Sequence, residues 1–215
     1  MCTAQNVQSK ELLAMDPRPL IALDGDGVLL DYNLAYAKAW ERATGRYPAE
    51  LDIQAYWAID RWDVERLSGE KLEQFRACFD VDFWSTIPPL ASAVEACHRL
   101  RDQGYDLVCV TALAEDLADA RLRNLRQHDF PIEKVFATAH SLEGRSPKAD
   151  VLEQLKPVAF VDDYLPYMVG VDGSIHKALV LREPKGSPNI GQHLSAVDST
   201  HADLSDFVRW WLSRH

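Results

Sequence analysis

Residues 20–31 read Leu20-Ile-Ala-Leu-Asp24-Gly-Asp26-Gly27-Val-Leu-Leu-Asp31, and they carry the most informative pattern in the sequence. Its first four residues form a continuous apolar run, which is typical of a strand that is covered on both faces of its sheet. Asp24 and Asp26 follow at once, and in open α/β sheets the carboxyl ends of the strands border the ligand crevice. The glycines let the backbone turn sharply and approach a ligand. Taken alone, Asp-Gly-Asp-Gly is also an ordinary turn sequence, so the rest of the chain must decide between a turn and a site.

Strand-like and helix-like patterns alternate through most of the remaining chain. Buried-strand patterns occur at residues 106–111, 135–138, 158–161 and 178–181, with helical patterns between them. This alternation predicts an α/β fold, namely a doubly wound, Rossmann-like parallel sheet with helices on both faces. Right-handed crossovers then place the carboxyl ends of all strands on one edge.

The segment 32–86 interrupts this alternation. Tyr36, Trp40 and Ala43 have helical spacing, and apolar residues later in the segment indicate a second helix, whereas strand alternation is missing. We therefore predict a small all-helical cap domain, 32–86, inserted after the first strand. Residues 1–31 and 87–215 then form the α/β core domain.

Composition limits the partners. The net charge of -10 argues against binding a nucleic acid polymer, but it permits a small phosphorylated substrate because a metal ion reverses the local field. The four cysteines lack CxxC spacing and are expected to be buried thiols of a reducing compartment, which favours a cytoplasmic location. The sequence shows neither a signal peptide nor a membrane-spanning segment, and both a monomer and a homodimer stay open.

Four groups of side chains are predicted to meet at the carboxyl edge of the sheet. They are the Asp24 and Asp26 pair, the hydroxyl of Thr111, the ammonium of Lys148, and the pair Asp162-Asp163. Carboxylates this close need a cation, and hard oxygen ligands suit Mg²⁺. A lysine and a hydroxyl suit a phosphate. Together these groups predict a site for phosphoryl transfer.

The order of these four motifs resembles the haloacid dehalogenase superfamily of phosphohydrolases. The motifs are Asp24-x-Asp26-Gly-Val, the strand ending in Thr111, then Lys148, and then Asp162-Asp163. The resemblance implies that Asp24 is a nucleophile that forms an aspartyl-phosphate, and that Asp26 is the general acid. It also implies that Thr111 and Lys148 hold the phosphoryl group. Mg²⁺ would be bound by Asp24, the backbone carbonyl of Asp26 and the acidic pair, with Asp163 as the favoured direct ligand and Asp162 behind it.

The resemblance also implies that the cap selects the substrate. Asn33 and Trp57 in the cap and Ala112 beside Thr111 are expected substrate contacts. The run from Gly27 to Tyr32 and the cap length are similar to the 5′(3′)-deoxyribonucleotidase branch, which would make the substrate a nucleotide. Whether Trp57, Trp62 and Trp84 stack on a flat group or simply form the cap core stays open.

The predicted function is therefore a Mg²⁺-dependent phosphatase that hydrolyses a small phosphomonoester. The open alternatives are a phosphomutase or a phosphonatase on the same fold, and a catalytically silent member that binds a phosphorylated ligand. Lys134 and Lys156 are rival candidates for the lysine role of Lys148. The arginines of the helix at 114–128 alternate with its leucines 117, 122 and 125, so Arg121, Arg123 and Arg126 are expected to form a solvated face.

Overall fold

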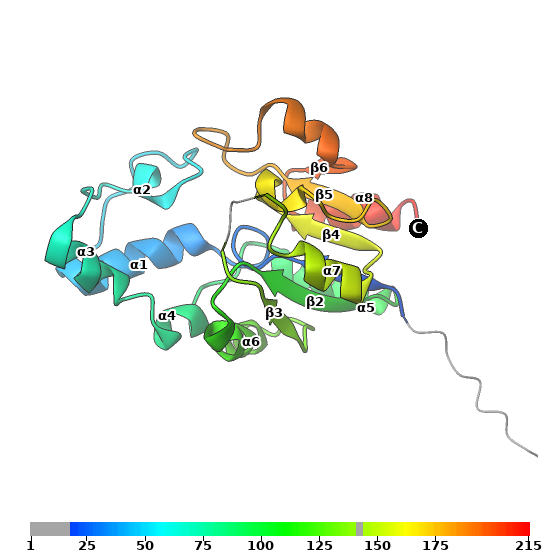
Figure 1. Cartoon of the computed structure of the whole chain (residues 1–215). Helices are drawn as coiled ribbons and strands as arrows, with labels where there is room; N and C mark the ends of the chain where they lie inside the picture. Colours follow the sequence, from blue (N-terminus) through cyan, green and yellow to red (C-terminus); the bar gives the residue numbers. More distant parts are fainter. Residues whose placement is uncertain (1–17, 141–143) are drawn as a thin grey trace, which may run out of the picture.

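A parallel sheet forms the centre of the molecule. The computed structural model describes residues 18–140 and 144–215. In this part of the chain six strands pair in the order β3-β2-β1-β4-β5-β6, and each neighbouring pair is parallel. The doubly wound sheet predicted from the sequence is therefore confirmed (Figure 1). The strands are β1 (Leu20–Leu23), β2 (Asp106–Thr111), β3 (Val135–Ala137), β4 (Ala159–Asp162), β5 (His176–Val180) and β6 (Ser199–His201).

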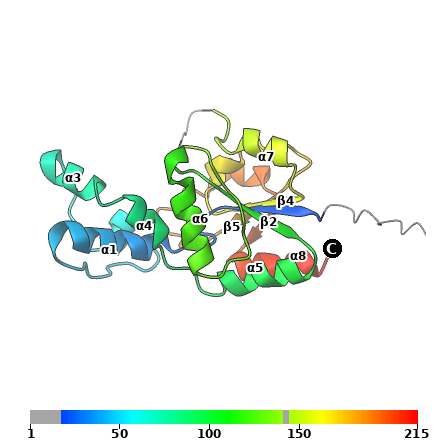
Figure 2. The same cartoon turned by 90° about the horizontal axis from the view of Figure 1, so that it is seen from below.

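Helices cover both faces of this sheet, as Figure 2 shows with α7 above the strands and α5 and α8 below them. The main helices are α1 (Tyr32–Thr44), α2 (Ala58–Arg61), α3 (Gly69–Arg76), α4 (Val81–Ser85), α5 (Ala93–Asp102), α6 (Ala118–Gln127), α7 (Ala149–Leu155) and α8 (Leu204–Leu212). Short 3₁₀ helices are η1 (Glu115–Leu117), η2 (Leu165–Met168) and η3 (Gly191–Ala196).

The apolar runs of the strands are explained by this double covering. Ile21 and Leu23 of β1 belong to the core on the face of the sheet that α5 and α8 cover. Ala22, which lies between them, belongs to the core on the opposite face, which α7 covers. Successive side chains of a strand point to opposite faces, so a strand covered on both sides must be apolar throughout. The predicted burial of Cys97 and Cys109 is confirmed, because both thiols are fully buried. Burial raises the pKa of the Cys109 thiol to about 12.

Helices α1 to α4 all lie between β1 and β2 in sequence and stand beside the core rather than on a face of the sheet (Figure 1). We call residues 32–86 the insertion. Asp31, the residue just before the insertion, caps α1, and its side chain accepts a hydrogen bond from the Leu34 amide at 2.9 Å. An aromatic cluster holds its helices together, with ring centroids of Tyr36 and Phe75 5.2 Å apart and those of Phe79 and Phe83 4.7 Å apart.

Within residues 18–140 and 144–215, none of the helices combines the length and the apolar character needed to cross a bilayer. Two of the sequence predictions concern residues outside the described part of the chain. They are the burial of Cys2 and the assignment of residues 1–17 to the α/β core domain.

Candidate active site

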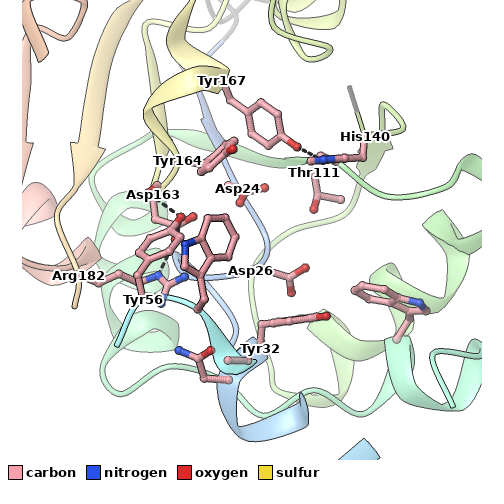
Figure 3. Close-up of a pocket in the computed structure, with 15 residues that line it drawn as sticks. Asp24, Asp26, Tyr32, Tyr56, Thr111, His140, Asp163, Tyr164, Tyr167 and Arg182 are labelled. Carbon is pink, nitrogen blue, oxygen red and sulfur yellow. Dashed lines mark hydrogen bonds and ion pairs between the residues drawn. The ribbon is translucent and has the colours of Figure 1, made fainter. Parts of the chain in front are cut away.

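The carboxyl edge of the sheet gathers the predicted residues. Asp24 follows β1, Thr111 is the last residue of β2, and Asp162 is the last residue of β4. The Asp24 amide donates to the Val161 carbonyl at 2.9 Å, which continues the pairing of β1 with β4 and fixes the carboxylate at the edge. Asp24, Thr111 and Asp162 are all buried, and so is Asp163. Residues far apart in the sequence therefore converge on one small volume (Figure 3).

Lys148 joins two of these carboxylates. It is the residue immediately before α7, and its Nζ lies 2.6 Å from Asp24 Oδ1 and 2.6 Å from Asp162 Oδ2. Burial alone would lower the pKa of Lys148, but attraction to Asp162 and Asp24 outweighs burial and holds the pKa above its ordinary value. The ammonium thus stays charged although it is fully buried. The rival candidates Lys134 and Lys156 are exposed.

Asp162 and Asp163 have different surroundings. Asp162 uses Oδ2 for Lys148, and its Oδ1 accepts the Tyr164 amide at 2.8 Å. Asp163 accepts Tyr56 Oη at 3.1 Å and Arg182 Nε at 2.5 Å, and both contacts fall on Oδ2. Burial raises the pKa of Asp163, and the Arg182 guanidinium opposes this rise.

The glycines of the loop after β1 bring its backbone against these acids. Gly27 has φ of +82°, a left-handed conformation that favours glycine. A side chain there would collide with the Asp163 carboxylate and would lie 2.7 Å from Arg182 Nε. At Gly25 a Cβ would lie 3.1 Å from Thr111 Oγ1. The Asp-Gly-Asp-Gly sequence is thus needed for close packing of the site, beyond any role in turning the chain.

Asp26 is held by an arginine that the sequence analysis placed wrongly. Arg121 was expected on a solvated helix face together with Arg123 and Arg126. Its side chain is fully buried instead, and Nη2 lies 2.8 Å from Asp26 Oδ1 and 2.9 Å from Oδ2. The other two arginines are exposed. Burial raises the pKa of Asp26, Arg121 opposes this rise, and Asp24 adds to it.

A cavity of about 340 Å³ opens above the carboxylates, between the core and the insertion. The predicted substrate contacts Asn33, Trp57 and Ala112 all line it, and so does Trp84. Trp62 lies elsewhere: it is buried and its Nε1 donates to the Asn33 carbonyl at 2.9 Å, so it belongs to the core of the insertion. The remaining lining residues are Asp24, Asp26, Tyr32, Tyr56, Ala58, Thr111, His140, Asp163, Tyr164, Tyr167 and Arg182.

Comparison with known proteins identifies the fold. No family model matches the sequence, and no curated protein matches it. Among solved structures, an L-2-haloacid dehalogenase from Xanthobacter autotrophicus with chloropropionic acid covalently bound has a TM-score of 0.59 at 14% identity, covering 92% of this chain and 100% of that chain. The chain has the haloacid dehalogenase (HAD) fold.

Two further solved structures of this fold hold ions. A HAD family hydrolase from Deinococcus radiodurans with bound phosphate and sodium has a TM-score of 0.57 at 16% identity, covering 92% of this chain and 96% of that chain. A D,D-heptose bisphosphate phosphatase from B. bronchiseptica, complexed with magnesium and phosphate, has a TM-score of 0.53 at 16% identity, covering 92% of this chain and 99% of that chain.

The acids of this HAD fold suit a hard divalent cation. Asp24, Asp162 and Asp163 each offer one carboxylate oxygen, and these oxygens all lie within 4.8 Å of one another. Buried carboxylates at such distances repel one another unless a cation lies among them. Oxygen donors are also the ligands that Mg²⁺ prefers. Both carboxylate oxygens of Asp162 already accept hydrogen bonds, one from Lys148 Nζ and one from the Tyr164 amide. Asp24 and Asp163 are therefore better placed to bind the ion directly.

Several residues of the site were missed by the sequence analysis. Arg182 lies two residues after the end of β5, and Tyr164 and Tyr167 lie two and five residues after the end of β4, so the rule that strand ends form the site could have found all three. Tyr56 and His140 lie in irregular segments with no sequence signal. His140 Nδ1 and Tyr167 Oη are 2.5 Å apart, a contact that joins two different strand-end loops.

Proposed function

We propose that the protein is a Mg²⁺-dependent phosphatase that hydrolyses a small phosphomonoester through an aspartyl-phosphate intermediate. The observation that carries the proposal is the position of Lys148, whose Nζ lies 2.6 Å from both Asp24 and Asp162. A fully buried ammonium beside a carboxylate at a cavity floor is suited to neutralise a nucleophile and the phosphoryl group that it receives. A buried ion pair is weak evidence for a stabilising role, so a role in catalysis accounts for this cation better than packing does.

In the first step a carboxylate oxygen of Asp24 attacks phosphorus and the bond between phosphorus and the leaving oxygen breaks. Asp26 gives its proton to that oxygen. In the second step Asp26 takes a proton from water, whose oxygen attacks phosphorus and breaks the bond to Asp24. Inorganic phosphate leaves and both carboxyl groups return to their starting states. Thr111 lines the cavity, and its Oγ1 would hold a phosphoryl oxygen throughout. Lys148 does not line the cavity, and it would act through its charge, which neutralises Asp24 and the phosphoryl group that Asp24 receives.

Asp24 and Asp163, with the backbone carbonyl of Asp26, would hold Mg²⁺, and Asp162 would hold Lys148. When bound, the ion would neutralise charge on the carboxylates and on the phosphate. The charges of the side chains support this proposal. With Asp26 protonated for its role as the acid, Asp24, Asp162 and Asp163 face three cations, Lys148, Arg121 and Arg182. These side-chain charges balance, so a phosphate dianion would add two negative charges that a divalent ion would neutralise.

The insertion, residues 32–86, would act as the cap that covers the substrate. Its contribution to the cavity is largely aromatic, through Tyr32, Tyr56, Trp57 and Trp84. Aromatic walls suit a flat leaving group, so a nucleoside monophosphate is the substrate class that we propose to test first. Dehalogenase chemistry is the second candidate because dehalogenases share the fold. Asp26 favours the phosphatase, since cleavage of a carbon–halogen bond needs no acid at that position.

The test is a panel of phosphate esters, including deoxynucleoside monophosphates, assayed for release of inorganic phosphate with Mg²⁺ and after chelation. A 2-haloacid assayed for halide release is included. We expect phosphate release that needs Mg²⁺ and is lost in Asp24→Asn. Turnover that survives this substitution would exclude Asp24 as the nucleophile, and equal rates after chelation would exclude the metal. Halide release without phosphate release would favour the dehalogenase.

A further inference from the structure

We propose that Arg121 is a positioning residue for Asp26: its buried guanidinium holds the Asp26 carboxyl where it can protonate the leaving group. This inference rests on the proposed function, in which Asp26 is the general acid. Arg121 itself does not line the cavity, so it would act through Asp26 and not on the substrate.

The guanidinium is confined from several sides. Its Cζ lies 5.3 Å from the ring centroid of Trp84, and a Cβ at position 25 would lie only 3.4 Å from it, so the arginine packs against the glycine of the loop that carries Asp26. The helix beneath it is fixed as well, because Asn124 Nδ2 donates to the Ile87 carbonyl at 2.9 Å. A cation held this firmly can fix the direction of its partner carboxylate.

Arg121 is an unfavourable choice for packing alone. Its Nε and Nη1 are buried, and neither has a hydrogen-bond partner among the described residues. A buried donor without a hydrogen-bond partner destabilises the folded protein. Replacing a buried ion pair by apolar side chains is often neutral or stabilising, so the pair is weak evidence for a stabilising role. A role in the chemistry of Asp26 accounts for an arginine here better than stability does.

Asp26 needs such a partner. Its side chain is 27% exposed at the cavity, and the negative charges of Asp24 and Asp163 act on it. Among the described residues, Arg121 is the one whose side chain is hydrogen-bonded or ion-paired to this carboxylate. Without it, the carboxyl could rotate away from the leaving oxygen, and a general acid must lie within hydrogen-bond reach of the atom that it protonates.

The experiment measures the rates at which the purified protein hydrolyses two phosphate esters in the presence of Mg²⁺. The p-nitrophenolate of p-nitrophenyl phosphate leaves without much help from an acid, whereas the alkoxide of β-glycerol phosphate needs a proton. We expect Arg121→Met to lose about 100-fold in kcat on the alkyl ester, within the range of general-acid catalysis, and less than about 10-fold on the aryl ester. A damaged fold would lower both rates alike. Arg123→Met, an exposed arginine on the same helix, is the matched control and keeps both rates.

A double-mutant cycle separates this inference from the proposed function. Asp26→Asn should show the same selective loss, and Asp26→Asn combined with Arg121→Met should be no slower on the alkyl ester than Asp26→Asn alone. The double variant leaves no unpaired buried charge, so it carries the test if Arg121→Met alone does not fold. A further loss of about 10-fold or more in the double variant, or equal losses on both esters in Arg121→Met, would overturn the inference while leaving the phosphatase intact. A wild-type protein that releases no phosphate from any ester would overturn both.

Discussion

Lys148 is the residue on which the geometry of the site depends most. It is fully buried, and each of its two short contacts joins a carboxylate from a different strand end, Asp24 after β1 and Asp162 at the end of β4. Its ammonium also lies 4.8 Å from the ring centroid of Tyr167. Removing this one charge would leave two carboxylates facing each other away from water, which is the costly way to break a buried ion pair.

We therefore predict that Lys148→Met lowers the free energy of unfolding by about 3–5 kcal/mol and abolishes phosphate release. Urea unfolding measures the first effect and the ester panel the second. Lys134→Met removes an exposed lysine, so it should change stability by less than about 0.5 kcal/mol and keep full activity. Adding Asp162→Asn to Lys148→Met should recover part of the stability because one of the unpaired charges is gone. Unchanged stability in Lys148→Met would contradict the ion-pair geometry.

At the scale of elements, the sequence predicted most strands but not the orientation of α6. The strands β1, β2 and β4 are apolar runs because both of their faces are covered, whereas β6 (Ser199–His201) is a polar edge strand and carries no such signal. In α6 the leucine spacing indicated a face with residues 117, 122 and 125. The structure buries Ala120, Arg121, Asn124 and Leu125.

The reason lies in partners that are distant in sequence. Arg121 and Asn124 are buried because Asp26 and the Ile87 carbonyl receive their hydrogen bonds. A hydrophobic period cannot recognise a buried face that contains polar residues, since polar side chains count against it. The acids at the strand ends could be placed because parallel strands share one carboxyl edge. Arg121 could not be placed by that rule because it comes from a helix.

The face of α6 makes a testable difference between two leucines. Leu125 is fully buried in the main core and Leu122 is only partly buried. Leu125→Ala should therefore lower the free energy of unfolding by about 2–5 kcal/mol, the usual cost of a large-to-small change in a core. Leu122→Ala should cost clearly less, although the leucine spacing treats the two alike. Urea unfolding measures the free energy of unfolding of both variants. Equal losses of stability in Leu125→Ala and Leu122→Ala would contradict the orientation of α6.

At the scale of the whole molecule, the loop after β5 joins the insertion to the core. The Tyr56 amide donates to the Lys185 carbonyl at 2.9 Å, and the Lys185 amide donates to the Gln54 carbonyl at 3.0 Å. Trp57 Nε1 donates to the Gly186 carbonyl at 3.0 Å. Tyr56 also reaches Asp163, so the same stretch that docks on the loop touches a proposed metal ligand. The position of the insertion and the geometry of the site are therefore physically connected.

Arg61 offers a way to weaken this contact, and its own side chain does not line the cavity. It is largely buried and lies 2.8 Å from Glu50 of the insertion and 3.2 Å from Glu183 of the loop. Arg61→Met removes both pairs, so we expect local opening of the contact to become more frequent. A loss of about 1.5 kcal/mol, typical of a hydrogen bond to a charged group, corresponds to roughly tenfold faster exchange of amides that exchange through this opening.

Hydrogen exchange followed by mass spectrometry measures this effect in peptides that contain the amides of Tyr56 and Lys185, which bond across the contact. Exchange in α5 and α8 should not change, because no residue of the contact belongs to these helices. Arg66→Met is the control, since Arg66 pairs with Asp60 at 3.5 Å with both side chains largely exposed. Slow exchange of both amides in Arg61→Met, equal to that of the wild type, would show that the backbone bonds alone keep the insertion on the core. The connection to Asp163 would then not depend on the charged pairs.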